Sequence, residues 1–338
     1  MLSQPVSEDV PTQITSENTS ARSVPRPDRK ATWMLVLITS MWGFSFTLMK
    51  DWQDAAQGCP GGEVVAGLTM VALRMFLALV VLGVFLPRLF RDPTQREFWI
   101  GLLLGGINSL GFVFQVTGLA WTSPALSAFV TSLASAWVPL LLFAIFRLPV
   151  HRLTLAGLMI GIAGAGVLGI QTSLAITFGW GEMLTFISTW FFALVIVLLD
   201  RLGRGVQSAH FTVAFLAGTG LPALLINGVV LTGGGETASW FHWTMGMLSD
   251  PLIWRDLILL TILCTVLPFH WFNVYQPRVA ASRAAVVYLL EPVFASIISI
   301  FWGHDILSAR LILGGSLILA GNALVELPAL LRTFKPAV

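Results

Sequence analysis

The chain alternates between ten long apolar stretches and short polar segments. A helix that crosses a bilayer needs about 20 mostly apolar residues, and each stretch approaches that length. The apolar runs are continuous, whereas barrel strands alternate apolar and polar positions. We therefore expect an all-α integral membrane protein with ten transmembrane helices, at 32–50, 64–86, 97–119, 124–146, 153–171, 181–200, 209–232, 254–275, 282–302 and 307–330.

Two patterns recur in the second half of the chain. They are Ser-x-Trp-x-Phe, at 40–44 and 188–192, and a glycine pair at one constant offset, Gly157 with Gly164 and Gly314 with Gly321. Each half holds five predicted helices, and an odd number forces the second copy to be inverted in the membrane. Inverted repeats are typical of secondary transporters, which bind substrate at the repeat interface near the bilayer midplane.

The expected domains follow from this duplication. They are a disordered cytoplasmic tail over 1–31, a first five-helix repeat over 32–171, a second over 172–330, and a cytoplasmic C-terminal tail over 331–338. The N-terminal segment is polar and rich in Ser, Thr and Pro. It lacks the apolar core of a signal peptide.

Composition favours a membrane protein over a soluble one. Of 338 residues, 56% are hydrophobic and 11% are charged, whereas a soluble domain has about 25% charged residues. A soluble fold cannot hide so much apolar surface, because its whole shell meets water. The net charge of +2 is too small to indicate a nucleic acid or an acidic partner.

Nothing in the sequence points to a metal or a cofactor. Cys59 falls in a predicted loop and Cys264 inside a predicted helix, so the two cysteines imply no disulfide framework. CxxC, HExxH and Cys/His clusters are absent. The phosphate-binding loop of nucleoside triphosphatases is absent too, which argues against direct ATP drive.

The distribution of Lys and Arg predicts the orientation of the chain. With the N-terminus in the cytoplasm, 15 of the 19 basic residues fall on the cytoplasmic side, three fall outside, and Arg74 lies within a helix. Positive residues concentrate in cytoplasmic loops. We expect a multi-pass protein of a bacterial-type inner (plasma) membrane, with both termini in the cytoplasm.

The segment after the seventh predicted helix, 233–253, is the one long connection. It carries Trp240, Phe241 and Trp243, and aromatic side chains of this kind gather at the membrane interface. We expect a flat interfacial segment here, with a ligand lid as the alternative.

Two charged residues lie deep inside predicted helices, Arg74 in the second and Glu291 in the ninth. A charge at the bilayer centre costs about 2.5–3.5 kcal/mol on insertion scales, so it needs a partner, a cavity or a task. One reading is a structural ion pair, with each other or with backbone groups. The other is that both line a central cavity, where the planar fork of Arg74 could hold a substrate carboxylate. Pro292 follows Glu291 and removes an amide from the helix.

A second group of candidate substrate-binding residues consists of polar or aromatic side chains within predicted helices. They are Trp42, Asn108, Gln115, Trp190, His270, Asn273 and Tyr288. Asn108 and Gln115 are seven residues apart and so share one helical face. The two tryptophans occupy matching repeat positions and could form a cavity wall. Each residue also has a structural reading: a histidine as a hydrogen-bond partner between helices, a tryptophan as a packing residue.

Several stretches resemble the drug/metabolite transporter superfamily, in particular its EamA-type ten-helix members. The resemblance covers residues 32 to about 325 and rests on the segments 42–46 (WGFSF), 72–74 (ALR), 118–125 (GLAWTSPA), 288–292 (YLLEP) and 303–308 (GHDILS), followed by Gly314 and 318–321 (ILAG).

The sequence departs from the usual family pattern at two points. Asp305 stands where the family commonly has Glu, and the fourth predicted helix has Pro139 but lacks a proline near Ala134 and Ser135. The resemblance implies a secondary carrier of small organic solutes, often an exporter.

We therefore expect a secondary transporter of small metabolites, such as amino acids or related solutes, that works by alternating access and is not an enzyme. Proton coupling and facilitated exchange both fit as energy schemes, with Glu291 as the candidate proton carrier. The alternative from another class is a membrane-embedded enzyme acting on a lipid or small molecule. An enzyme would need a nucleophile, an acid/base pair or a metal cluster at the membrane surface, and the sequence has no such cluster.

The orientation can be tested with reporter fusions or cysteine labelling. Both termini and the segments 87–96 and 201–208 should be inside, whereas 51–62 and 233–253 should be outside. Termini on opposite sides of the membrane would contradict the even number of helices.

Overall fold

The computed structural model describes residues 29–90, 94–147, 149–169, 179–202, 208–275, 278–279 and 287–334. Within these ranges every regular element is helical, which confirms the expected all-α class. The elements are α1 (Arg29–Ala55), α2 (Gly62–Phe85), η1 (Pro87–Phe90), α3 (Gln95–Leu119), α4 (Pro124–Ser132), α5 (Ala134–Phe146), α6 (Arg152–Gly169), α7 (Trp180–Leu202), α8 (Ser208–Gly234), α9 (Thr237–Met247), α10 (Pro251–Thr261), η2 (Ile262–Val266), α11 (Leu267–Tyr275), α13 (Glu291–Trp302) and α14 (Ala309–Phe334).

In the described part of the chain, eight helical segments are long and apolar enough to cross a membrane. Two of the eight are composite, α4 with α5 and α10 with η2 and α11. The helices α6 and α13 are apolar but shorter, and α13 has 12 residues. Ten crossings remain a prediction, because the count depends on these two helices.

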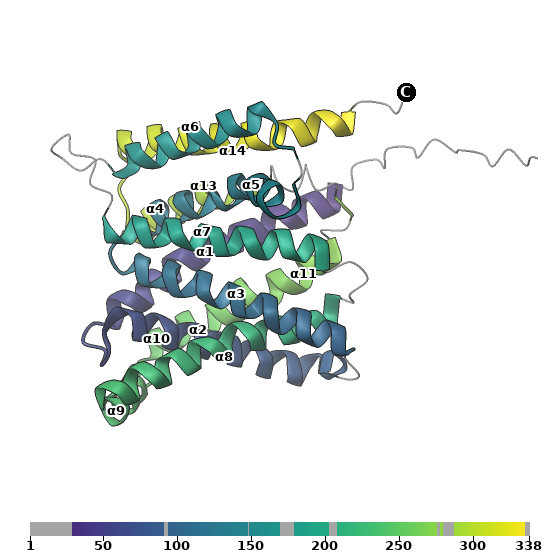
Figure 1. Ribbon diagram of the computed structural model, residues 1–338. Helices are drawn as coiled ribbons and strands as arrows, with labels where there is room; N and C mark the ends of the chain where they lie inside the picture. The colour runs from purple at the N-terminus through teal and green to yellow at the C-terminus, as the bar shows by residue number, and fades with distance from the viewer. Residues whose placement is uncertain are drawn as a thin grey trace, which may run out of the picture.

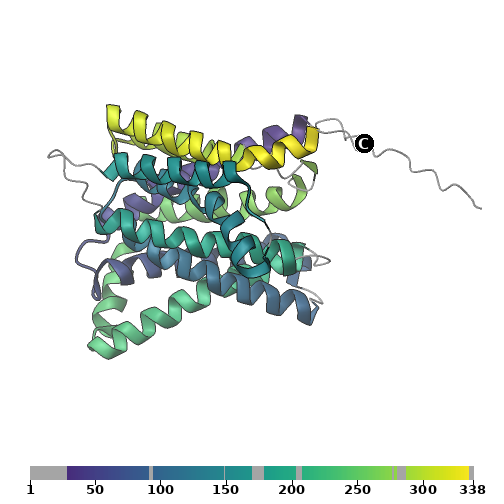
Figure 2. The same ribbon diagram turned by 45° about the horizontal axis from the view of Figure 1, so that its top comes forward.

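The helices lie side by side as one bundle, with the start of α1 and the end of α14 at the same end (Figures 1 and 2). We call this the terminal end and the opposite one the far end. At the far end, the Lys50 ammonium of α1 donates hydrogen bonds to the carbonyls of Leu119 and Ala120, both at 3.2 Å. At the terminal end, the Arg96 side chain of α3 donates to the carbonyl of Leu202 at 3.4 Å. α1 and α3 therefore run in the same direction, and α7 runs in the opposite one.

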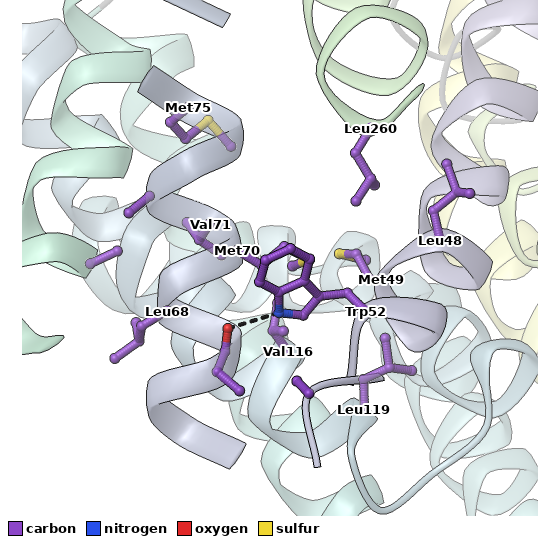
Figure 3. Packing of buried hydrophobic residues seen from close by; sticks show 14 of the residues in the cluster. Leu48, Met49, Trp52, Leu68, Met70, Val71, Met75, Val116, Leu119 and Leu260 are labelled. Atoms are coloured by element: carbon purple, nitrogen blue, oxygen red, sulfur yellow. Dashed lines mark hydrogen bonds between the residues drawn. The ribbon is translucent and has the colours of Figure 1, made fainter. Parts of the chain in front are cut away.

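The largest buried cluster is centred on Trp52 near the end of α1 (Figure 3). The indole is fully buried, and its Nε1 donates to the carbonyl of Ala66 in α2 at 3.0 Å. Around it pack Leu48 and Met49 of α1, Leu68, Met70 and Val71 of α2, Val116 of α3 and Leu260 of α10. Lipid is as apolar as these side chains, so close packing and hydrogen bonds hold the cluster together.

The glycine pairs found in the sequence bring α6 and α14 into backbone contact. A β-carbon on Gly164 would lie 2.8 Å from the carbonyl oxygen of Gly314, and one on Gly157 would clash with that of Gly321. The first glycine of each pair thus meets the second glycine of the other pair. Such an exchange of equivalent contacts is what a two-fold axis produces. It supports the inverted arrangement of the repeats.

Other helices follow the same exchange. α1 packs against α13, and its counterpart α7 packs against α4 and α5. The contact of α1 with α13 in one direction thus has its counterpart in the contact of α7 with α4 and α5 in the other.

The long far-end connection forms the helix α9, which was expected as a flat interfacial segment. Trp240 of α9 donates from Nε1 to the Thr69 hydroxyl of α2 at 3.0 Å. Asn227 of α8 donates to the same hydroxyl at 2.9 Å, and Thr69 itself donates to the carbonyl of Val65 at 2.7 Å. One hydroxyl thus joins α2, α8 and α9.

The α6–α14 contact gives a matched pair of substitutions. Gly164→Ala should lower the melting temperature of the detergent-solubilised protein, because overpacking typically costs about 1–3 kcal/mol. Gly166→Ala in the same helix meets nothing within 4 Å and gains helix propensity, so it should leave the melting temperature unchanged or slightly raised. Equal effects of the two variants would show that the close contact is not required.

Candidate functional site

Two helices are interrupted within the bundle, one in each repeat. In the first repeat, α4 ends at Ser132 and α5 begins at Ala134. In the second, a turn at 289–290 precedes α13, which begins at Glu291. When the two repeats are aligned by the offset from Gly157 to Gly314, Leu133 of the first repeat corresponds to Leu290 of the second. The two interruptions therefore occupy equivalent positions in the two repeats. α4 and α13 are also in contact. Paired broken helices near the midplane are where inverted-repeat transporters bind substrate.

The interruption between α4 and α5 is held by side chains from other helices. Asn322 of α14 donates from Nδ2 to the Ser132 carbonyl at 3.1 Å and to its hydroxyl at 3.0 Å. Ser135 donates to the same carbonyl at 2.9 Å. Gln115 of α3 donates to the Thr131 hydroxyl at 3.0 Å. The freed backbone groups are thereby satisfied, and the predicted residue Gln115 lies at the break.

Glu291 is the first residue of α13, and its side chain is partly exposed. Across the described residues its carboxylate has neither a hydrogen bond nor an ion pair. The start of a helix carries a partial positive charge, which favours an acidic side chain there. Pro292 occupies the second position of α13, where its missing amide is tolerated.

Helix α1 lies directly on this helix start. A β-carbon on Gly43 would lie 2.9 Å from both the Glu291 carbonyl oxygen and the Ala295 amide nitrogen. A larger residue at this position would push α1 away from Glu291. This close approach accounts for the glycine in the WGFSF stretch.

Arg74 is 3% exposed, and its guanidinium group already has hydrogen-bond partners within the protein. Its Nε donates to the Thr265 hydroxyl at 2.6 Å and its Nη2 to the Cys264 carbonyl at 3.0 Å. Its guanidinium also lies 5.7 Å from the centroid of the Phe112 ring. Among the described residues Arg74 forms no ion pair with Glu291. The backbone pairing anticipated as the structural alternative is therefore the one observed.

A π-helical turn makes this pairing available. Cys264 and Thr265 belong to η2, where the helix carries i to i+5 bonding. Thr265 donates its own hydroxyl proton to the Leu260 carbonyl at 2.8 Å, which leaves its oxygen free to accept from Arg74. Arg74 thus links α2 to the composite helix of the second repeat.

The two repeat-related tryptophans each face the other repeat. Trp42 of α1 lies among Phe269 and Phe272 of α11 and Tyr288, with ring centroids 5.7–6.2 Å away. Trp190 of α7 lies 4.3 Å from the Trp137 ring of α5 and is 44% exposed. The role of the two tryptophans as walls of a cavity stays a prediction.

The remaining candidate residues, Asn108, His270 and Asn273, are not found at the helix interruptions. Asn108 donates to the Thr219 hydroxyl at 3.3 Å and so joins α3 to α8. His270 is exposed on α11, and the side chain of Asn273 lies outside the described residues. The structure thus groups Trp42, Tyr288 and Glu291 around the start of α13.

Four polar residues at the α4–α5 break were missed by sequence reasoning. They are Thr131, Ser132, Ser135 and Asn322. The available signal was the cluster of three hydroxyl residues within one apolar stretch, just before Pro139.

A duplicated bundle of apolar helices with matching interruptions is typical of membrane transporters. Residues 29–170 and 179–327 each match the EamA-like transporter family, and the chain belongs to that family. The repeated match also shows that the fold is a duplication.

Two relatives from Archaeoglobus fulgidus carry the name uncharacterized transporter. One is 26% identical over 262 residues, covering 77% of this chain and 86% of the relative. The other is 23% identical over 293 residues, covering 87% of this chain and 84% of the relative. A solved crystal structure of a protein superposes with a TM-score of 0.53 at 18% identity, over 90% of this chain and 97% of that chain, and supports the fold.

A double-mutant cycle can distinguish a structural role of Arg74 from a role in substrate binding. Arg74→Lys loses the planar fork, and Thr265→Val loses one acceptor of that fork. Because a hydrogen bond to a charged group contributes about 1.5–3 kcal/mol, each variant should lower the melting temperature, and the double variant should lower it by less than the sum. Impaired transport with unchanged stability would instead indicate that Arg74 contacts an anionic substrate.

Proposed function

We propose that the protein is a secondary transporter that carries small organic metabolites across the inner membrane by alternating access. The observation that supports this best is the pair of corresponding helix interruptions, one in each repeat. They place polar side chains at one break and Glu291 at the other, between two halves that can rock against each other. The cytoplasmic placement of both termini rests on the distribution of Lys and Arg.

The charges inside the bundle favour a solute with an amino group. The guanidinium of Arg74 already has a hydroxyl, a carbonyl and an aromatic ring as partners. The carboxylate of Glu291 has no partner in the described chain. Inside a bilayer an unpaired charge needs a task. Glu291 therefore receives the cationic group of the substrate, which fits amino acids and related amines.

The aromatic rings near Glu291 suit the apolar part of such a solute. Tyr288 precedes Glu291 by three residues and packs against Trp42. Aromatic faces attract cations and also cover flat apolar groups. Transport proceeds without covalent change of the solute, and export is the direction that the family resemblance favours.

Two energy schemes lead to different results when Glu291 is neutralised. If Glu291 carries the coupling proton, Glu291→Gln should abolish accumulation driven by a pH gradient and leave exchange of labelled solute intact. If Glu291 holds the amino group, exchange should fall as well, by about tenfold or more, the effect of one lost charge-assisted hydrogen bond.

The experiment uses proteoliposomes with no added cofactor and a panel of labelled amino acids and amines. Glu63→Gln, at an exposed position in the first turn of α2, is the matched control and should transport like the parent protein. Normal accumulation by Glu291→Gln with an intact pH response would remove Glu291 from the mechanism. Recovery of a chemically altered solute would favour the enzyme alternative.

A further inference from the structure

A group of hydrogen bonds joins the two repeats at the far end of the bundle. Asp51, at the end of α1, accepts from Trp302 Nε1 at 2.8 Å and lies 2.7 Å from His304 Nε2. The other ring nitrogen of His304 lies 3.8 Å from a carboxylate oxygen of Asp54. We call these four residues the far-end latch. Two belong to the first repeat and two to the second.

The turn after α13 directs the latch back towards the first repeat. Gly303 adopts φ +91°, a left-handed conformation that favours glycine and ends the helix. Asp305, two residues later, accepts from the Ala125 amide at 3.1 Å and from the Ser299 hydroxyl. Its carboxylate therefore caps the start of α4. The same turn ties α13 to both α1 and α4.

A third helix reaches the latch from the second repeat. Arg255 of α10 lies 6.0 Å from the centroid of the Trp302 ring and pairs with Asp256 at 2.7 Å. Trp302 thus contacts Asp51 through its nitrogen and Arg255 through its ring. Phe44 of α1 packs on the same ring at 5.4 Å.

The latch is more exposed than the residues of α1 beneath it. Deeper along α1, Leu48 and Met49 are almost completely buried, whereas Trp302 is 43% exposed and His304 and Asp51 are partly exposed. Hydrogen bonds near water can exchange their partners for water at a small net cost. The latch can therefore open without leaving buried polar groups unsatisfied.

We propose that the far-end latch is the outer gate of the transporter and that the described conformation is closed to the outside. The proposal rests on the proposed alternating access, which requires the repeats to separate at one end at a time. Opening the outer side breaks the bonds of Asp51 to Trp302 and His304. The contact of α1 with α13 below the latch then becomes accessible from the far end.

The test measures access to a cysteine placed below the latch. Ser296→Cys lies on α13 between Glu291 and Trp302, at a buried position. The variant is treated with a membrane-impermeant thiol reagent in sealed vesicles whose outer surface carries the far end. The labelling of the parent protein, which has only Cys59 and Cys264, is subtracted. Asp51→Asn and His304→Gln should each raise the labelling rate by about tenfold, the effect of one lost charge-assisted hydrogen bond.

Lys50→Gln is the matched control. It removes a neighbouring charge, but the recorded partners of Lys50 are Asp54 and two carbonyls of the same repeat. Its labelling rate should stay near that of the parent. Equal rates for folded Asp51→Asn, His304→Gln and the parent would overturn the gate, as would an equal rise with Lys50→Gln. Size-exclusion profiles establish that each variant is folded.

The assay contains no solute. A failure to find a transported solute therefore leaves its result unchanged, whereas a closed far end in every latch variant refutes the gate alone.

Discussion

Backbone groups that leave a helix inside a bilayer must find another partner, and this constraint governs the central part of the bundle. The Ser132 carbonyl, freed where α4 ends, receives Asn322 from α14. The Cys264 carbonyl, in the π-helical turn, receives Arg74 from α2. In both cases a residue of one repeat satisfies the backbone of the other. The irregular segments are thereby what joins the two halves of the molecule.

The same constraint separates two charged residues that look alike in the sequence. Arg74 lies at a π-helical turn that offers it a carbonyl and a hydroxyl, and it is almost completely buried. Glu291 lies at a helix start, where the backbone offers only a partial charge. Its carboxylate remains without a protein partner in the described chain. A structural charge differs from a candidate binding group in whether its hydrogen-bonding groups have protein partners. Its depth in the membrane does not make this distinction.

Hydrophobic patterning predicts which segments are helical, since all ten apolar stretches contain helix where the structure describes them. It also predicts the glycine contact of α6 with α14, because the spacing of small residues is visible in the sequence. It does not predict the break at Leu133, which has neither glycine nor proline and depends on Asn322 from a distant helix. Patterning indicates the depth of a residue, but packing decides which neighbour it faces. Arg74 and Asn108 illustrate this limit. The partner of Arg74 is Thr265 of η2, and the partner of Asn108 is Thr219 of α8.

The Thr69 hydroxyl has a consequence for how the protein is assembled during synthesis. It donates to Val65 and accepts from both Asn227 and Trp240, so its hydrogen-bonding capacity is used completely. The two donors to Thr69 lie on α8 and α9, which leave the ribosome long after α2. The docking site for α9 is complete only when α8 has joined α2 in the membrane. The surface helix should therefore be among the later elements to settle, and a chain truncated before Trp240 would leave the far end of α2 without its cover.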